Sequence, residues 1–173
     1  MSSEVVNDYT IWAIPSEPTL MSLRSQIVDL ARAHGGPIFE PHVTIVSRVN
    51  LPLFEVLIRL HELAKQTKIP IEVTTRPPSF STTYFQNVLL EIESVAALLQ
   101  LNVNAKAMYE KPNDPYFAHL SLMYGNQTMV ERERIVHGLD PLTYTFAIAC
   151  LYVVPTGLAI SDWQPVAKID LGR

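Results

Sequence analysis

The sequence predicts an α+β fold in which two pseudo-symmetric lobes, each an antiparallel β-sheet with helices packed outside, surround a central cleft. Two observations predict it. Strand-like and helix-like segments alternate along the 173 residues, yet no glycine-rich phosphate loop follows any strand, so a doubly wound nucleotide-binding sheet lacks its signature. Two stretches of the same pattern also lie 77 positions apart, around His42 and His119. Two similar halves are expected to fold around a twofold axis.

Each stretch places a histidine at the start of a short buried strand. Each contains an aromatic residue, two spacers, the histidine, an aliphatic residue, a hydroxyl residue and a second aliphatic residue; the stretches are Phe39–Ile45 and Tyr116–Leu122. Because side chains alternate along a strand, His42 and Thr44 share one face, and His119 and Ser121 share another. The pattern of a histidine with a hydroxyl two places on is common by chance, so alone it is weak.

The spacing of 77 residues aligns more than the histidines. The apolar Ile11–Ala13 falls on Val88–Leu90, although almost no residue other than the histidine is identical. The repeat is therefore one of pattern. We predict a single domain over residues 1–173 with internal halves of about residues 9–78 and 86–155 and a C-terminal strand.

In the first half, Tyr9–Ile14 is predicted to be a strand that ends at Pro15. A helix is predicted from Pro18 to about Ala33, because Leu20 begins an apolar stripe of helical period and glycines and a proline follow.

The first histidine strand is predicted over His42–Ser47. Asn50 is expected to cap the next helix, whose apolar residues repeat every 3.6 positions. A strand over Ile69–Thr75 and a junction at Arg76–Ser79 complete the first half.

The second half repeats this order. Its predicted elements are a strand over Tyr84–Ile92, a helix from the cap Ser94 to about Tyr109, and the second histidine strand His119–Tyr124. Thr128 and Glu131 form a capping-box sequence for a helix through about His137.

The end of the chain is predicted to hold one long strand over Thr143–Val154 and a last strand over Val166–Leu171. Trp163 lies between them.

Composition narrows the class of protein. Hydrophobic residues make up 48% and charged residues 17% of the chain, which is typical of a folded globular protein. The net charge is −4 and no Lys- or Arg-rich run is present, which argues against a long nucleic-acid partner. The single cysteine, Cys150, favours a reducing compartment. No signal sequence or bilayer-length apolar run is visible, so we expect a cytoplasmic protein that does not associate with membranes. We also expect a monomer.

Two imidazoles and two hydroxyls that face one cleft suit acid–base chemistry on a phosphate. With these residues, the sequence resembles the two-histidine (2H) phosphoesterases and, within them, the eukaryotic cyclic phosphodiesterases. The resemblance spans essentially the whole chain; its markers are Ile11–Pro15, Pro41–Thr44, Tyr84–Gln86, Pro115–Tyr124 and Trp163. Two departures are modest: Ala118 replaces a frequent proline, and Tyr84 replaces a usual phenylalanine.

The resemblance implies an enzyme that opens ADP-ribose 1″,2″-cyclic phosphate and nucleoside 2′,3′-cyclic phosphates without a metal or another cofactor. It implies that His119 activates water and His42 protonates the leaving ribose oxygen; the sequence alone does not order them. Thr44 and Ser121 would donate hydrogen bonds to the non-bridging phosphate oxygens.

Aromatic residues complete the expected substrate site. Tyr124 would cap the pocket, and Trp12, Tyr84 and Phe85 would stack on a base or ribose. The competing interpretation for these aromatic residues is core packing. The remaining histidines, which have no hydroxyl partner, are expected to be solvated: His34, His61 and His137.

Three other functions stay open on sequence grounds. A metal-dependent phosphoesterase would need carboxylates grouped with the histidines, and only Glu40 lies within a motif. A second alternative is an RNA-end phosphodiesterase or 2′-5′ RNA ligase-like enzyme of the same superfamily. The acidic net charge disfavours a long RNA substrate for such an enzyme. A non-catalytic module that binds cyclic phosphates would not need two titrating groups.

Overall fold

A computed structural model describes residues 8–68 and 70–172. Within these residues, eight strands join in the order β6-β3-β4-β5-β2-β1-β7-β8, and every neighbouring pair is antiparallel. The strands are β1 (Tyr9–Ala13), β2 (Val43–Val49), β3 (Ile71–Ser79), β4 (Val88–Ile92), β5 (His119–Met123), β6 (Thr145–Ile148), β7 (Cys150–Pro155) and β8 (Ala167–Asp170). The helices are α1 (Thr19–His34), α2 (Leu53–Gln66), α3 (Ala96–Met108) and α4 (Met129–His137), with 3₁₀ turns at Tyr84–Gln86 and Ile160–Asp162. The predicted α+β class is confirmed.

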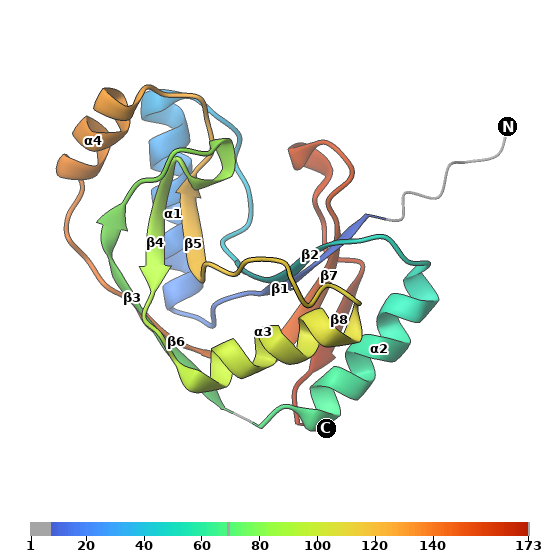
Figure 1. Cartoon of the computed structure of the whole chain (residues 1–173). Helices are drawn as coiled ribbons and strands as arrows, with labels where there is room; N and C mark the ends of the chain where they lie inside the picture. The colour runs from blue at the N-terminus through green and yellow to red at the C-terminus, as the bar shows by residue number, and fades with distance from the viewer. Residues whose placement is uncertain (1–7, 69, 173) are drawn as a thin grey trace, which may run out of the picture.

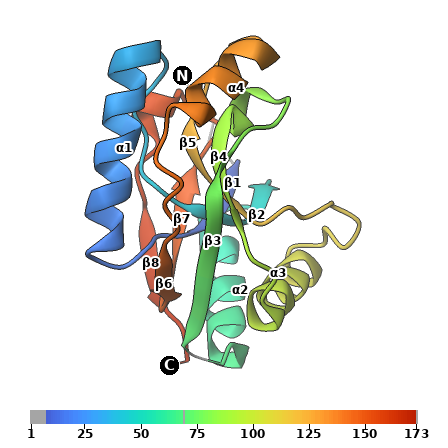
Figure 2. The same ribbon diagram turned by 90° about the vertical axis from the view of Figure 1, so that its left-hand side faces the viewer.

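The strands divide into two lobes that meet at the two histidine strands (Figure 1). One lobe contains β3, β4, β5 and β6, with α1 and α4 packed on it; the other contains β1, β2, β7 and β8, with α2 and α3 packed on it. In Figure 2, β3 lies at the front, and the helices of each lobe lie on the outer side of its strands. The predicted pair of lobes with external helices is therefore present.

The two lobes are joined by very little backbone pairing. Within the described residues, β2 and β5 pair only at Val43 and Leu120. These two positions are 77 apart, the same spacing as the histidines, so the pseudo-twofold axis passes between them. Each histidine is the residue immediately before this pair.

The two halves of the chain interlock across the lobes. Strand β3 comes from the first half but pairs with β4, and β7 comes from the second half but pairs with β1. Helix α1 likewise packs on β5, and α3 packs on β2. Each lobe therefore needs elements of both sequence halves.

The residues behind the histidines form the core. Val43, Ile45, Leu120 and Leu122 are all completely buried. This is the alternation that the sequence predicts, with the apolar side of each strand packed inside and the polar side left for the cleft.

The predicted strand over Thr143–Val154 is wrong. The segment forms two strands, β6 and β7, with a break at Ala149. Ile148 pairs with Ile71 in one lobe, whereas Cys150 pairs with Asp170 in the other. Both pieces are apolar and extended, so the periodicity gives no sign of this change of partner.

Several boundaries also differ. Tyr84–Gln86 is a 3₁₀ turn before β4, and not the start of the predicted strand. Asn50 and Ser94 do not cap helices, because α2 and α3 begin after Pro52 and Val95. By contrast, the capping box of α4 forms as predicted, with Thr128 and Glu131 bonded to each other's backbone N–H groups. The predicted junction at Arg76–Ser79 is also wrong, because these residues continue β3, where Pro78 and Ser79 pair with β4. The remaining bounds shift by a few residues.

Two expectations rest partly on residues outside the described ranges. The predicted start of the third strand, Ile69, lies outside them, as do residues 1–7, on which the expected lack of a signal sequence depended. Among the described helices, none has both the length and the apolar character required to cross a bilayer.

A buried arginine on α4 fixes the 3₁₀ turn that borders the cleft. Arg132 is 4% exposed and donates from Nε to the Gln127 carbonyl at 2.8 Å. Its Nη1 donates to the carbonyls of Ser81 at 2.5 Å and Thr83 at 2.9 Å. Because a buried guanidinium must have acceptors for its donors, Arg132 and these carbonyls together hold the segment before Tyr84 in place.

We expect Arg132→Gln to lower the free energy of unfolding by about 2–4 kcal/mol, because the shorter side chain loses several charge-assisted hydrogen bonds and leaves space at a buried position. Urea denaturation measures the change. Arg134→Gln is the matched control on the exposed face of the same helix, and it should change stability by no more than about 0.5 kcal/mol. Equal effects of the two substitutions would contradict the role of Arg132.

Candidate active site

A cavity of about 580 Å³ lies at the junction of the lobes. Seven of the eight residues proposed from the sequence line it: Trp12, His42, Thr44, Phe85, His119, Ser121 and Tyr124. The eighth, Tyr84, does not line the cavity but packs against the lining residue Phe85, with ring centroids 5.0 Å apart. His34, His61 and His137 are exposed on helices and do not line the cavity.

Both cavity histidines are oriented by the same backbone contact. His42 Nδ1 lies 2.7 Å from the Glu40 carbonyl, and His119 Nδ1 lies 2.8 Å from the Phe117 carbonyl. A carbonyl can only accept a hydrogen bond, so Nδ1 carries the proton in each ring. The unprotonated Nε2 of each neutral ring is therefore the nitrogen left for chemistry.

Burial makes both rings reluctant to take up a second proton. Desolvation lowers the pKa of His42 to about 4, the Glu40 carbonyl opposes this shift, and the nearby His119 adds to it. Desolvation also lowers the pKa of His119, against the hydrogen bond to Phe117. Both imidazoles are therefore neutral in the free protein at neutral pH, and a bound anion would favour charging one of them.

One face of each histidine ring is covered by a stacked aromatic ring. Trp12 stacks on His42 with centroids 3.7 Å apart and an angle of 7° between the planes. Phe117 stacks on His119 with centroids 5.1 Å apart. Trp12 is only 1% exposed, so its ring lies beneath His42 and presents little surface to a ligand. Its face can stabilise an imidazolium.

The two hydroxyls differ in their present partners. Ser121 Oγ donates to the Phe85 carbonyl at 2.6 Å. Its partner across the pseudo-twofold axis, Thr44, lines the same cavity but has no hydrogen bond from its hydroxyl to another described residue. The Thr44 hydroxyl is thus ready to donate to a ligand, whereas Ser121 must first turn away from Phe85.

One wall of the cavity is aromatic. We define the aromatic wall as Phe85, Tyr124 and Trp163, which line the cavity together. Phe85 and Trp163 stack with centroids 6.0 Å apart, and Tyr124 meets Phe85 edge-on at 5.1 Å. Phe85 is 49% exposed whereas Tyr124 is 3% exposed, so Phe85 offers most of the accessible ring surface.

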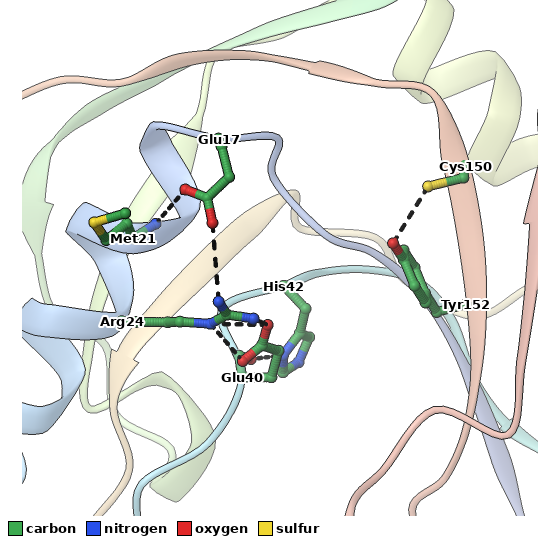
Figure 3. Close-up of polar contacts among 7 residues, drawn as sticks. All are labelled: Glu17, Met21, Arg24, Glu40, His42, Cys150 and Tyr152. Carbon is green, nitrogen blue, oxygen red and sulfur yellow. Dashed lines mark hydrogen bonds and ion pairs between the residues drawn. The ribbon is translucent and has the colours of Figure 1, made fainter.

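An ion pair anchors the loop that orients His42 (Figure 3). Arg24 on α1 donates from Nε to both carboxylate oxygens of Glu40, at 3.1 and 3.0 Å, and from Nη2 to one of them. Glu17 lies 3.9 Å from the same guanidinium. The backbone carbonyl of Glu40 is the group that accepts from His42, so α1 is linked to the His42 ring through the single residue Glu40.

Sequence reasoning missed this anchor. Glu40 lies inside the first motif without a counterpart in the second, and that asymmetry was the available signal. Its partner Arg24 lies sixteen positions away on a helix that was expected only to pack.

Asn102 is also missed. It is 3% exposed and donates from α3 to the Ile45 carbonyl at 2.7 Å, which fixes the strand that carries Thr44. An asparagine in an otherwise apolar helix face was the signal for it.

Among the described residues, no three His, Cys, Asp or Glu side chains lie together as a possible metal site.

The fold and the paired histidines define a class. Two lobes that each bring a histidine strand to one cleft are the arrangement of the two-histidine (2H) phosphoesterases. Solved structures share the fold at low sequence identity. E. coli LigT in complex with 3′-AMP has a TM-score of 0.69 and 11% identity, covering 96% of this chain and 99% of that chain. The protein TT0787 of Thermus thermophilus has a TM-score of 0.67 and 14% identity, covering 95% and 98%.

The sequence narrows the class to a family. Residues 8–171 match the family described as "Cyclic phosphodiesterase-like protein", and the chain belongs to that family. A curated relative, the cyclic phosphodiesterase of Arabidopsis thaliana, is 26% identical over 178 residues, which is 97% of this chain and 98% of the relative. The chain is therefore a 2H phosphoesterase of the cyclic phosphodiesterase family, as its motifs indicated.

Acid should destabilise the fold through His42. Its pKa is about 4 when folded and about 6.5 when unfolded, so below pH 6.5 the unfolded chain binds a proton that the folded chain refuses. The contribution of His42 to the free energy of unfolding is fully present above pH 6.5. It should fall by about 3 kcal/mol as the pH drops to 4.

Urea denaturation of wild type and of His42→Gln at pH 7 and pH 4 isolates this contribution. The substituted protein should lose about 3 kcal/mol less over that range. His61→Gln, at an exposed site, should behave like wild type. An equal acid loss in wild type and His42→Gln would show that His42 is not held in its neutral form.

Loosening the anchor should slow turnover without removing a reacting group. Arg24→Gln and Glu40→Gln should each lower kcat for a cyclic phosphodiester by roughly three- to tenfold, because a small displacement of a reacting ring is costly. The double variant should be no slower than the slower single variant, since the two residues act as a unit. Arg32→Gln, on the same helix and exposed, is the control. Additive losses would indicate separate roles.

Proposed function

We propose that this enzyme hydrolyses ADP-ribose 1″,2″-cyclic phosphate and nucleoside 2′,3′-cyclic phosphates to monophosphates by two-histidine acid–base catalysis without a metal ion. The observation that carries the proposal is the matched pair of rings. His42 directly precedes β2 and His119 begins β5, and these strands pair at the residue after each histidine. Both rings line one cavity and keep Nε2 free by the same backbone contact.

The similar proteins support this class of substrate. The Arabidopsis relative is named a cyclic phosphodiesterase. E. coli LigT, which shares the fold, has been solved with 3′-AMP, NADP+ and ATP. A cavity of about 580 Å³ is large enough for a nucleotide, since ligand pockets span about 300–1,000 Å³.

Ring opening requires a base for the attacking water and an acid for the leaving oxygen on opposite sides of phosphorus. Following the family resemblance, we assign His119 as the base, whose neutral Nε2 accepts a proton from water. His42 is assigned as the acid, which donates a proton from Nε2 to the departing ribose oxygen. Each ring finishes the cycle in the other's starting protonation state, so a proton must return before the next turnover.

The low pKa of His42 suits an acid that is charged only when substrate is bound. The cyclic phosphate is a monoanion, and its charge next to the ring would raise the pKa of His42. Once formed, an imidazolium of low intrinsic pKa is a strong proton donor. Glu40 keeps the ring correctly oriented in both protonation states.

Thr44 and Ser121 are proposed to donate to the non-bridging phosphate oxygens, where charge grows in the transition state. Thr44 can donate directly, whereas Ser121 exchanges its bond to the Phe85 carbonyl for one to phosphate. This exchange links binding of the anion to the turn that carries Phe85.

The aromatic residues are proposed to bind the base or ribose, with Phe85 as the exposed platform and Tyr124 as the cap beside it. Tyr84 supports Phe85 from behind. For Trp12, burial beneath His42 favours a role in orienting and shielding the imidazole over direct stacking on substrate.

Product analysis by phosphorus NMR with adenosine 2′,3′-cyclic phosphate tests the proposal. The kcat/KM profile should be bell-shaped in pH, and its limbs should report the coupled pair of histidines. His42→Ala and His119→Ala should each lower kcat by about a hundredfold or more. The double variant should be little worse than the poorer single variant.

His61→Ala, at an exposed histidine, is the matched control and should retain wild-type kcat. Circular dichroism must show each variant folded. Exhaustive EDTA treatment should leave turnover unchanged; a loss that a divalent ion restores would refute the metal-independent mechanism. Near-normal turnover by a folded His42→Ala or His119→Ala protein would refute the acid–base assignment.

A further inference from the structure

The two ends of the cleft are chemically unlike, although the fold is pseudo-symmetric. Positions 77 apart in sequence correspond across the pseudo-twofold axis. Tyr124 of the aromatic wall corresponds to Ser47, and Phe85 corresponds to Asp8. All four line the cavity. The symmetry is kept at the histidines and lost at the flanks, which is expected when the ligand itself is asymmetric.

We define the polar wall as eight further cavity-lining residues that carry a charge or a hydroxyl. These are Asp8, Thr10, Ser47, Arg48, Lys106, Asp114, Tyr116 and Thr156. The two cations, Arg48 and Lys106, come from β2 and α3, which pack against each other.

The backbone places Arg48 on this wall at an energetic cost. Its φ angle is 54°, in the left-handed region that residues other than glycine seldom occupy. The register between β1 and β2 also shifts there, because Tyr9 pairs with Val49 whereas Ile11 pairs with Val46. The extra residue is a bulge, and bulges next to active sites commonly redirect a side chain.

Both cations converge on one loop residue. Arg48 Nη2 lies 3.7 Å from the Asp114 carboxylate, and Lys106 Nζ donates to the Asp114 carbonyl at 2.8 Å. Lys111 also lies 3.8 Å from this carboxylate. Asp114 thus balances part of the charge and holds the two cations near each other, while each retains donors for a ligand.

A hydroxyl on the same wall lacks a partner. The Tyr116 hydroxyl oxygen is buried and makes no hydrogen bond to the rest of the described protein. Burial raises the pKa of Tyr116, so the group remains an O–H donor at neutral pH. Asp8 Oδ1 is likewise buried without a partner among the described residues and is an acceptor for a hydroxyl. A ligand that carries both an anionic group and hydroxyls would satisfy both atoms.

We propose that the polar wall binds a phosphoryl group on the 5′ carbon of the same ribose whose cyclic phosphate reacts. This inference rests on the proposed function. In a ribose ring the base-bearing C1′ adjoins C2′, and C4′, which carries the 5′ carbon, adjoins C3′. With the cyclic phosphate between the histidines, the base and the 5′ substituent therefore extend to opposite ends of the cleft. The preferred substrates are ribose cyclic phosphates with a 5′-phosphate or 5′-diphosphate, bound through Arg48 and Lys106.

Calorimetric binding of two stable ligands tests the subsite without turnover. Adenosine 3′,5′-bisphosphate should bind wild type roughly three- to tenfold more tightly than adenosine 3′-phosphate, because the exposed Arg48 and the partly exposed Lys106 would bind the added phosphate. The advantage should shrink at high ionic strength. Adenosine 2′,3′-cyclic phosphate with and without a 5′-phosphate should show the same ratio in kcat/KM.

Substitutions test whether the polar wall causes the tighter binding of the ligand with a 5′-phosphate. Arg48→Asn, which tolerates the left-handed backbone, and Lys106→Gln should each remove most of it and leave the binding of adenosine 3′-phosphate nearly unchanged. Arg48→Lys should retain part of it. Arg32→Gln, exposed on α1 and outside the cavity, should keep the whole advantage.

Equal affinity for the two ligands in wild type, or an advantage that survives both Arg48→Asn and Lys106→Gln, would overturn the inference. The proposed function fails in a different way. If neither cyclic phosphate is hydrolysed but the Arg48-dependent binding advantage is present, the subsite stands and the catalytic proposal falls. If both are hydrolysed at equal rates and the ligands bind equally, the catalytic proposal stands and the subsite falls.

Discussion

The structure depends on the contact between two strands that share little backbone. Strands β2 and β5 pair at Val43 and Leu120, and each of these residues directly follows a histidine. Beyond this pair, the interlocked halves hold the lobes together, since β3 and β7 cross to the opposite lobe. Neither histidine can therefore move far without disturbing both lobes.

Desolvation is the second constraint. Placing two imidazoles in a partly closed cavity lowers the pKa of both and would leave them as neutral bases. The protein offsets this with backbone carbonyls that accept from Nδ1 and with aromatic rings that shield one face. The remaining stabilisation of the charged form must come from an anion.

Pseudo-symmetry explains why catalytic and specificity residues differ in their predictability. The proposed catalytic positions, His42 and His119, are duplicated in the sequence pattern, so each half supports the proposal made for the other. The flanking positions, such as Tyr124 and Ser47, are related by the same axis but differ in chemistry. The same scaffold thus offers an aromatic surface at one end and cations at the other. Supporting residues such as Arg24 and Arg132 occur once, and nothing in the repeat points to them.

The α+β class, the two histidine strands, their hydroxyls and the family could all be read from the sequence, because alternation and the 77-residue spacing are local or repeated signals. The partner of each strand could not: Thr143–Val154 reads as one strand, yet Ala149 divides it between lobes. Likewise, only the folded chain places Arg24 on Glu40, Trp12 beneath His42 and Arg48 beside Lys106. Periodicity records which face of an element is apolar, whereas long-range partners are chosen by packing between segments that are distant in sequence.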